Sequence, residues 1–396
     1  MNDPSSSSSF SSSTLPKTQH AWTYTSQGLP RDILSLSTTF PVPPPPSGSN
    51  LLIRVTHVGL NPGCYMTLQA IPPFIRKIVS QGKTTWIPEG EFSGIVVLVG
   101  PGVARAESRI QTDAAGRQKL DSGSSNERIF TPGTCVFGSL PVSALLGGDG
   151  ALAQYISVSS SQVAVAPSSM KMEEAAGLSG AGCTAWAMLN EVPGLSLDIT
   201  KDTRVFVNGG SGGVGTMLIQ LAKNMGAHVV ATCSERSRAL IESLGADEVI
   251  DYQSTSPLPT HLTSHYSSQN RKFDYIFDTI GSQTLFLSSP SYLVPHGAYI
   301  NVGNFEGIGN TVLRAVWNTY ARWYLPTFLG GVPRRYIMVS TTPNGIKAGM
   351  LARMVEDGKL RVVIDEVVEF EDVLRAYDRM LARNALGKII IKVQDV

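Results

Sequence analysis

Three glycines in the stretch from Asp202 to Gly226 have the spacing that holds a diphosphate in many nucleotide-binding proteins. They fit G-x-G-x-x-G, in which glycine permits a tight turn, close approach of the main chain to a pyrophosphate, and close packing of helix on strand. Free N–H groups and the dipole at a helix N-terminus also favour the negative bridge. We therefore expect a dinucleotide to contact Gly210, Ser211, Gly212, Gly213, Val214 and Gly215.

A strand must precede this turn and a helix must follow it. Val205 and Val207 are two positions apart, as are residues on one face of a strand, whereas Met217, Leu218 and Leu221 recur at helical spacing. An ordinary Gly-rich loop is the alternative, but the strand and helix around the glycines favour the dinucleotide site.

The tip of the next strand, 228–232, decides between the two nicotinamide dinucleotides. An NAD site places an acidic side chain there for the ribose 2′-hydroxyl, whereas an NADP site needs positive charge for the 2′-phosphate. The tip carries Ser234, Arg236 and Arg238, and arginine offers a fork of donors that suits phosphate. NADPH is therefore preferred over NADH. Glu235 could turn inward and reverse the choice, and the arginines could instead lie on a solvated turn.

Composition narrows the class of protein. The 396 residues suffice for two domains, and a net charge of +1 argues against nucleic acid as a partner. The four cysteines show no C-x-x-C spacing, which favours a reducing compartment, and no apolar run reaches the length of a transmembrane helix. We expect a cytoplasmic protein. A mitochondrial location is less favoured, because the Ser-rich segment 1–19 has one cation and one acid and reads as a disordered tail.

Several sequence blocks resemble one family. They are GLNPGCY (59–65), PEGEFSGIVVLVGPGV (88–103), PGTCVFG (132–138), GALAQYISV (150–158), EEAAGLSGAGCTAW (173–186), the glycine turn, LGADEVIDY (244–252) and GKIIIKV (387–393). The chain from Ala21 onward resembles the medium-chain dehydrogenase/reductase superfamily. Within it, the chain is most similar to the zinc-free quinone-reductase and enoyl-reductase branch, with its quinone-oxidoreductase homologues and reticulon-interacting oxidoreductases.

The resemblance implies an α/β fold with a GroES-like β-rich barrel domain and a doubly wound Rossmann domain with a parallel sheet. Its domains would be the barrel (20–171, with a polar surface insertion at 104–129), the NADP-binding domain (172–303), an aromatic-basic insertion (304–343) and a return to the barrel domain (344–396). The insertion could be a lid over the site, a patch for a membrane or partner, or a buried amphipathic helix. The segment 254–271 reads as an irregular link.

The resemblance also implies further cofactor contacts. Thr184 matches a position close to the nicotinamide, Tyr252 ends a matching block, and Lys388 matches a lysine near the cofactor, although a surface role is an equal alternative. Ile280 and Val302 follow apolar strands, and ligands bind at the carboxyl ends of strands in open α/β sheets.

A catalytic zinc ion is not expected. Zinc-dependent members carry G-H-E-x-x-G, whereas Gly90 stands here in place of the histidine ligand, and Cys64 lies in a different motif. His261 and His265 are four residues apart, without a cysteine or carboxylate in register, and are expected on the surface.

Without a metal ion, hydrogen-bond donors must stabilise the oxygen that gains charge during hydride transfer. Tyr65 is the candidate donor, with water as the alternative, and Asn61 would orient the nicotinamide ribose or the substrate carbonyl. Both could instead be structural.

The sequence therefore predicts an NADPH-dependent, metal-free reductase that transfers hydride to a small electrophile, a quinone or an activated C=C bond such as an enone or enal. One alternative is a trans-acting enoyl-thioester reductase of a biosynthetic pathway. Another is a membrane-associated or structural relative that retains NADPH binding. We expect a monomer or homodimer, with peripheral membrane contact left open.

Overall fold

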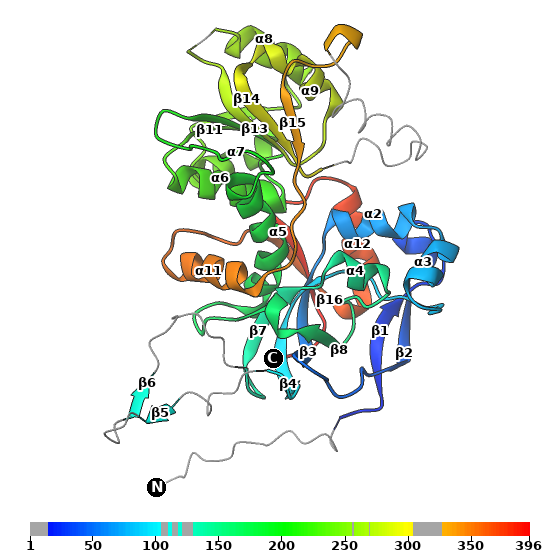
Figure 1. The fold of residues 1–396 in the computed structure, drawn as a ribbon. Coiled ribbons are helices and arrows are strands. Elements are labelled where there is room, and N and C mark those ends of the chain that lie inside the picture. Colours follow the sequence, from blue (N-terminus) through cyan, green and yellow to red (C-terminus); the bar gives the residue numbers. More distant parts are fainter. Residues whose placement is uncertain are drawn as a thin grey trace.

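The computed structural model describes residues 15–103, 110–112, 118–120, 130–255, 257–268, 270–303 and 327–396. They form two lobes joined by a long central helix, α5 (Met172–Asn190), with the β-rich lobe below the α/β lobe in Figure 1. The predicted fold class is confirmed. No described helix is long and apolar enough to cross a bilayer.

The β-rich lobe is built on a mixed sheet in the order β16-β17-β3-β4-β7-β9, with β8 also paired to β3. A separate antiparallel pair, β1 with β2, packs beside it. The strands are β1 (Thr18–Thr23), β2 (Ser35–Pro41), β3 (Asn50–Gly59), β4 (Glu91–Val99), β7 (Cys135–Ser139), β8 (Tyr155–Ser159), β9 (Val163–Val165), β16 (Ile364–Glu369) and β17 (Lys388–Lys392). Folded structure therefore begins at Thr18, inside the range predicted as a tail.

Short helices border this lobe. They are α1 (Pro30–Ile33), α2 (Pro62–Ala70), α3 (Pro73–Val79), α4 (Val142–Leu146) and α12 (Val373–Leu381). Helix α2 begins where Asn61 has extended dihedral angles and Pro62 supplies a preset φ at the first helical position. This start fixes the direction of the segment that carries Tyr65.

The α/β lobe has a parallel sheet in the order β12-β11-β10-β13-β14-β15. Its strands are β10 (Arg204–Asn208), β11 (His228–Cys233), β12 (Glu248–Asp251), β13 (Phe273–Asp278), β14 (Leu293–Asn301) and β15 (Arg335–Met338), and its helices are α6 (Gly213–Asn224), α7 (Arg238–Ser243), α8 (Leu258–Tyr266) and α9 (Gln283–Ser288). Helix α11 (Gly345–Glu356) packs on α5 and on β9 of the β-rich lobe. The chain order reverses between β10 and β13, and ligands of such sheets bind in the crevice at this point.

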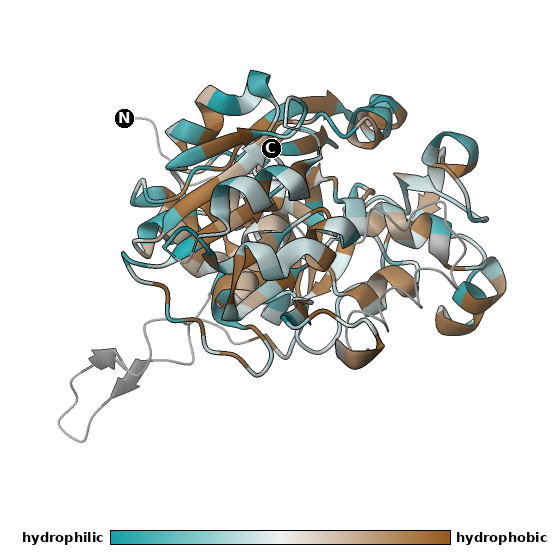
Figure 2. Cartoon of the chain, turned by 90° about the horizontal axis from the view of Figure 1, so that it is seen from above, coloured by the Kyte–Doolittle hydropathy of each residue, from teal (hydrophilic) through white to brown (hydrophobic). Residues whose placement is uncertain are grey.

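Alternate residues of the central strands pack on opposite faces of this sheet. Val205 and Val207 face the cluster that contains α5, α6 and α11, whereas Phe206 faces the cluster that contains α8 and α9. Figure 2 shows brown, apolar strands lying among helices of mixed colour. The sheet is thus covered on both faces, as the apolar strands predicted.

Two sequence predictions for this lobe are wrong. The expected irregular link contains helix α8, whose Leu262 and Tyr266 are buried. The end of the expected insertion is β15, where Tyr336 stacks on Tyr299 with ring centroids 5.8 Å apart. The aromatic and basic residues of 304–326 lie outside the described residues, so the lid is untested. Only the short strands β5 (Ile110–Thr112) and β6 (Gln118–Leu120) are described between 104 and 129.

Candidate active site

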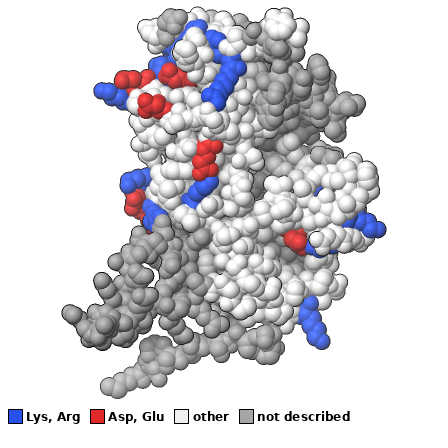
Figure 3. Space-filling view, viewed as in Figure 1, with Lys and Arg blue, Asp and Glu red and all other residues white. Residues whose placement is uncertain are grey.

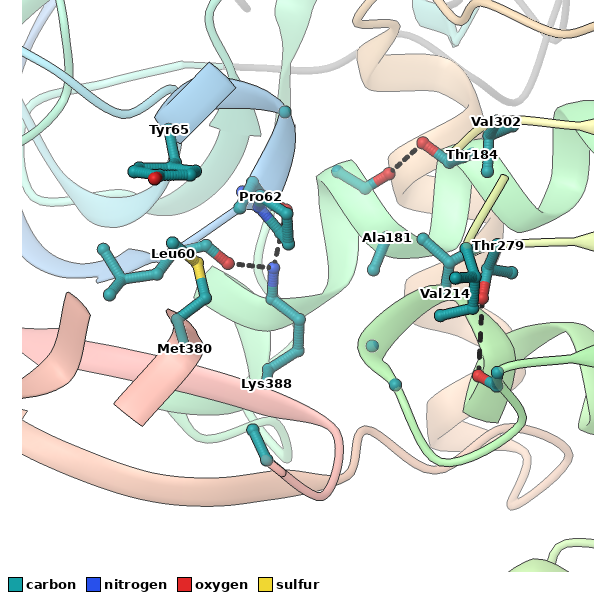
Figure 4. A pocket seen from close by; sticks show the side chains of 18 of the residues that line it. Leu60, Pro62, Tyr65, Ala181, Thr184, Val214, Thr279, Val302, Met380 and Lys388 are labelled. Carbon is teal, nitrogen blue, oxygen red and sulfur yellow. Dashed lines mark hydrogen bonds between the residues drawn. The ribbon is translucent and has the colours of Figure 1, made fainter. Parts of the chain in front are cut away.

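A cavity of about 980 Å³ lies between the two lobes, at the point where the strand order of the parallel sheet reverses. Figure 4 shows its two walls: Tyr65, Leu60 and Lys388 belong to the β-rich lobe, and Thr184, Val214 and Val302 face them from the other side. On the face drawn in Figure 3, charged side chains of the described residues form small groups of both signs rather than a continuous basic surface. A small-molecule site fits this shape and charge better than a nucleic-acid surface.

The glycine turn lines the cavity on the side of the α/β lobe. After β10 the chain reverses at Gly209, which has φ +82, and α6 begins at Gly213. A Cβ on Gly215 would lie 2.1 Å from the carbonyl oxygen of Gly209, so only glycine lets α6 approach the strand. A Cβ on Gly212 would meet nothing closer than 3.5 Å. The tight turn is therefore made one residue earlier than predicted, and Gly212 leaves open space over the main chain.

This cradle fits a dinucleotide. Gly210, Gly212 and Gly215 lie in the predicted strand-turn-helix unit, and Ser211, Gly212, Gly213 and Val214 line the cavity. Gly210 packs against β11, to which it donates a hydrogen bond at the carbonyl of Thr232 (2.8 Å). Of the other predicted contacts, Thr184, Tyr252, Ile280, Val302 and Lys388 line the same cavity.

The residues predicted for the ribose phosphate lie outside the cavity lining. Ser234 is buried and bonds the hydroxyl of Ser237. Arg238 pairs with the carboxylate of Glu235 at 2.9 Å and donates to the carbonyl of Val249, so its charge is already matched. Arg236 donates to the carbonyl of Asn384 in the segment before β17. The structure thus separates the two arginines: only Arg236 has no carboxylate partner among the described residues.

A buried aspartate that sequence reasoning missed orders the loop after β13. Asp278, at the end of β13, accepts hydrogen bonds from the amides of Ile280, Gly281 and Ser282, from Asn208 and from the hydroxyl of Tyr299. Burial and the neighbouring carboxylate hold the pKa of Tyr299 well above its usual value, which keeps this donor protonated. These bonds fix the loop that presents Ile280 to the cavity. An aspartate ending an apolar strand is the signal in the sequence.

The β-rich wall contains a second buried network. Asn61 donates through Nδ2 to the carbonyl of Gly59 (3.0 Å) and to Glu91 (3.0 Å), and its Oδ1 accepts from Lys388 (2.8 Å). Lys388 is 3 % exposed, so the surface role considered for it is wrong. Both amide hydrogens of Asn61 are used inside the protein. Asn61 therefore lines the cavity, but its amide group has no free hydrogen to donate to a ligand.

Tyr65 lies on α2 with its ring packed in the core of the β-rich lobe and lines the cavity. Among the described residues, its hydroxyl group has no hydrogen-bond partner. Burial raises the pKa of Tyr65 above its ordinary value, so the phenol is protonated at neutral pH and can donate.

Glu89 is a fully buried carboxyl group next to this wall. Its Oε1 accepts from the hydroxyl of Tyr377 (2.7 Å) and its Oε2 from the amide of Asn61 (3.1 Å), while its φ of 65 is unusual for a residue with a side chain. Burial raises the pKa of Glu89 to about 7. Burial and Glu89 together also raise the pKa of the Cys64 thiol well above its usual value.

The described residues do not fit a catalytic zinc ion. No group of three or more His, Cys, Asp or Glu side chains gathers within them closely enough to hold a metal. Gly90 supplies no ligand, and the carboxylate of Glu91 is bound by Lys388 at 2.8 Å. His261 and His265 stack on each other on helix α8, with ring centroids 4.0 Å apart. Zinc needs about three protein ligands in a catalytic site.

Comparisons with known proteins agree with this architecture. A family profile described as zinc-binding dehydrogenase matches residues 244–391. The chain is 34% identical to the trans-enoyl reductase poxH of Penicillium oxalicum (strain 114-2 / CGMCC 5302), over 96% of this chain and 98% of that protein. It is 30% identical to the mitochondrial NAD(P)H oxidoreductase RTN4IP1 of Danio rerio over 68% of each chain.

Among solved structures, the quinone oxidoreductase from Coxiella burnetii superposes with a TM-score of 0.70 at 22% identity, covering 95% of this chain and 99% of that one. The predicted resemblance is confirmed by these matches. The two-lobed fold, the glycine turn at the strand-order reversal and the full-length similarity lead to one conclusion: the chain belongs to the medium-chain dehydrogenase/reductase family.

Proposed function

We propose that this protein is an NADPH-dependent reductase that acts on carbon–carbon double bonds conjugated to a carbonyl group, or on quinones. One observation carries the proposal: the glycine turn and Tyr65 line the same cavity. The hydroxyl group of Tyr65 has no hydrogen-bond partner among the described residues, so it can donate to a substrate. The names of the relatives, a trans-enoyl reductase and an NAD(P)H oxidoreductase, support this reaction class.

NADPH, when bound along the glycine turn, supplies the hydride and its electron pair. On the α/β side, Thr184, Ile280 and Val302 would border the nicotinamide. On the opposite side, the hydroxyl of Tyr65 would donate a hydrogen bond to the carbonyl oxygen of the substrate. That oxygen gains negative charge as hydride reaches the β-carbon, and a proton from water or from Tyr65 completes the reduction at the α-carbon.

A substitution of Tyr65 tests this assignment. Tyr65→Phe removes the donor and keeps the ring, so we expect turnover to fall about 10²-fold, as for loss of one oxyanion donor, without a change in the Kd for NADPH. Steady-state kinetics and fluorescence titration measure the two quantities. Tyr155→Phe, on β8 and outside the cavity lining, is the matched control. Unchanged turnover in Tyr65→Phe would exclude the phenol as the donor.

A second candidate is a trans-acting enoyl-thioester reductase of a biosynthetic pathway. The full-length similarity to trans-enoyl reductases favours it over quinone reduction. The rates of NADPH oxidation with enoyl thioesters, 2-alkenals and quinones discriminate the substrate classes. A preference for quinones over every enoyl compound would reject the thioester assignment.

We infer a reducing compartment, the cytoplasm, from the four free thiols of Cys64, Cys135, Cys183 and Cys233. Fractionation of cells that express the full chain tests this inference. Recovery in the mitochondrial fraction would contradict it.

A further inference from the structure

Lys388 has no donor left for a cofactor phosphate. Its ammonium group donates to the carbonyl of Leu60 (2.9 Å), to Oδ1 of Asn61 (2.8 Å) and to Oε2 of Glu91 (2.8 Å). An ammonium group carries three donors, and all three are used within the protein. The predicted direct contact between the charge of Lys388 and the cofactor is therefore not supported by this geometry.

The aliphatic part of Lys388 nevertheless lies against the glycine turn. A Cβ on Gly213 would stand 2.7 Å from Cδ of Lys388, and the amide of the preceding residue, Gly387, donates to the carbonyl of Ser211 at 2.8 Å. Gly387 has φ +88, and a Cβ there would lie 2.2 Å from the carbonyl oxygen of Val363. One end of Lys388 thus contacts the cofactor cradle, and the other holds the turn that precedes Tyr65.

Glu91 connects Lys388 and Asn61 to the central helix α5. Its Oε1 accepts a 2.5 Å hydrogen bond from the amide of Gly180, within α5, while its Oε2 bonds Lys388 and Asn61. A Cβ on Gly180 would come within 2.9 Å of that carboxylate, so a side chain there would displace Glu91. Helix α5 also presents Thr184 to the cavity. The Glu91–Lys388 pair therefore connects both walls of the site.

We propose that Lys388 is a positioning residue, which couples occupancy of the glycine turn to the placement of Asn61 and Tyr65. The route runs from Gly213 through the side chain of Lys388 to Asn61, whose carbonyl accepts the amide of Tyr65 at 3.2 Å. Figure 4 shows Lys388 between Leu60 and Pro62 on one side and Ala181 of α5 on the other. The inference rests on the proposed function, because it assumes that NADPH occupies the turn.

Lys388→Met tests the coupling, since it keeps the apolar stem and removes the three donors. We expect the Kd for NADPH to change little, turnover to fall about tenfold or more, and NADPH-induced protection of residues 61–70 from hydrogen exchange to be lost. Lys392→Met is the matched control on the same strand, since Lys392 pairs with the exposed Asp395. It should leave all three measurements unchanged.

A double variant separates positioning from simple charge neutralisation. Lys388→Met leaves the carboxylate of Glu91 buried without its cation, which can prevent folding. Lys388→Met combined with Glu91→Gln removes both charges and should fold, yet keep the low turnover and the missing protection. Recovery of wild-type turnover in the double variant would overturn the proposal, as would a tenfold weaker NADPH affinity with unchanged turnover. Absence of NADPH binding by the wild-type protein would instead reject the proposed function.

Discussion

At the residue scale, the hydrogen-bond and ion-pair partners of a charged side chain decide whether it is available to bind a ligand. Arg236 and Arg238 looked equivalent in the sequence, but the structure gives Arg238 a carboxylate partner and leaves Arg236 bonded to a neutral carbonyl. A guanidinium already paired with Glu235 must lose that partner before it can bind a phosphate. We therefore propose that Arg236, rather than Arg238, contacts the 2′-phosphate of NADPH.

Arg236→Ala should weaken NADPH binding about tenfold, the range of one hydrogen bond to a charged group, and leave NADH binding nearly unchanged. Arg238→Ala serves as the comparison and should have the smaller effect. Titration of each variant with both nucleotides measures the four dissociation constants. Equal losses for NADPH and NADH in Arg236→Ala would contradict the phosphate assignment.

The sequence predicted residues that act through a local pattern, and for Asn61 and Lys388 it missed the distant contacts rather than the residues. The six residues of the glycine turn and Tyr65 belong to contiguous motifs, and all but Gly210 and Gly215 line the cavity. Glu91 and Lys388 stand 297 positions apart, and Glu89 and Tyr377 stand 288 apart. A carboxylate in an apolar strand shows that a partner is needed, but it does not say which residue supplies it.

At the element scale, two glycines of the turn have different roles, one in packing and one in leaving space for a ligand. Gly215 allows α6 to pack on the strand, whereas Gly212 leaves space over the main chain. The motif predicted this strand-turn-helix unit well because Gly212 and Gly215 contact Gly209, within six residues in the chain. Helix α8 was missed because its Pro, Ser and His residues favour a loop locally, although Pro257 and Pro259 lie at its start, where proline is tolerated.

Gly212→Ala and Gly215→Ala form a matched pair that tests this separation. In Gly212→Ala, we expect nearly wild-type thermal stability and a loss of NADPH binding, because the added methyl group fills the open space. In Gly215→Ala, we expect a large loss of stability, since the methyl group would collide with a carbonyl oxygen 2.1 Å away. Differential scanning fluorimetry with and without NADPH distinguishes the two. A stable Gly212→Ala protein that binds NADPH normally would contradict the cradle.

At the scale of the whole molecule, the buried carboxyl group of Glu89 links global stability to pH. The pKa of Glu89 is raised to about 7 from 4.5, so the folded protein keeps a proton that the unfolded chain releases. The stability that this group contributes is complete below pH 4.5 and is lost as the pH rises to about 7. Over that window the loss amounts to about 3 kcal/mol.

Glu89→Gln should remove this part of the pH dependence, because glutamine resembles the protonated acid and does not titrate. Urea unfolding of both proteins across pH 4.5 to about 8 measures the difference in their unfolding free energies. We expect the variant to gain relative to the wild type as the pH rises. Parallel profiles would show that Glu89 does not titrate in this window.

Strand β17 lies between β16 and β3 within the sheet of the β-rich lobe, although it follows nearly all of the chain in sequence. A nascent polypeptide leaving the ribosome could assemble the strands of the α/β lobe, 204–338, before residues 388–392 have been made. Until then, residues 57–59 of β3 would lack their final neighbour, and Asn61 would lack the ammonium group that binds its side chain. This wall of the cavity would therefore be completed late in biogenesis, and molecular chaperones would have an interval in which to protect the exposed end of β3.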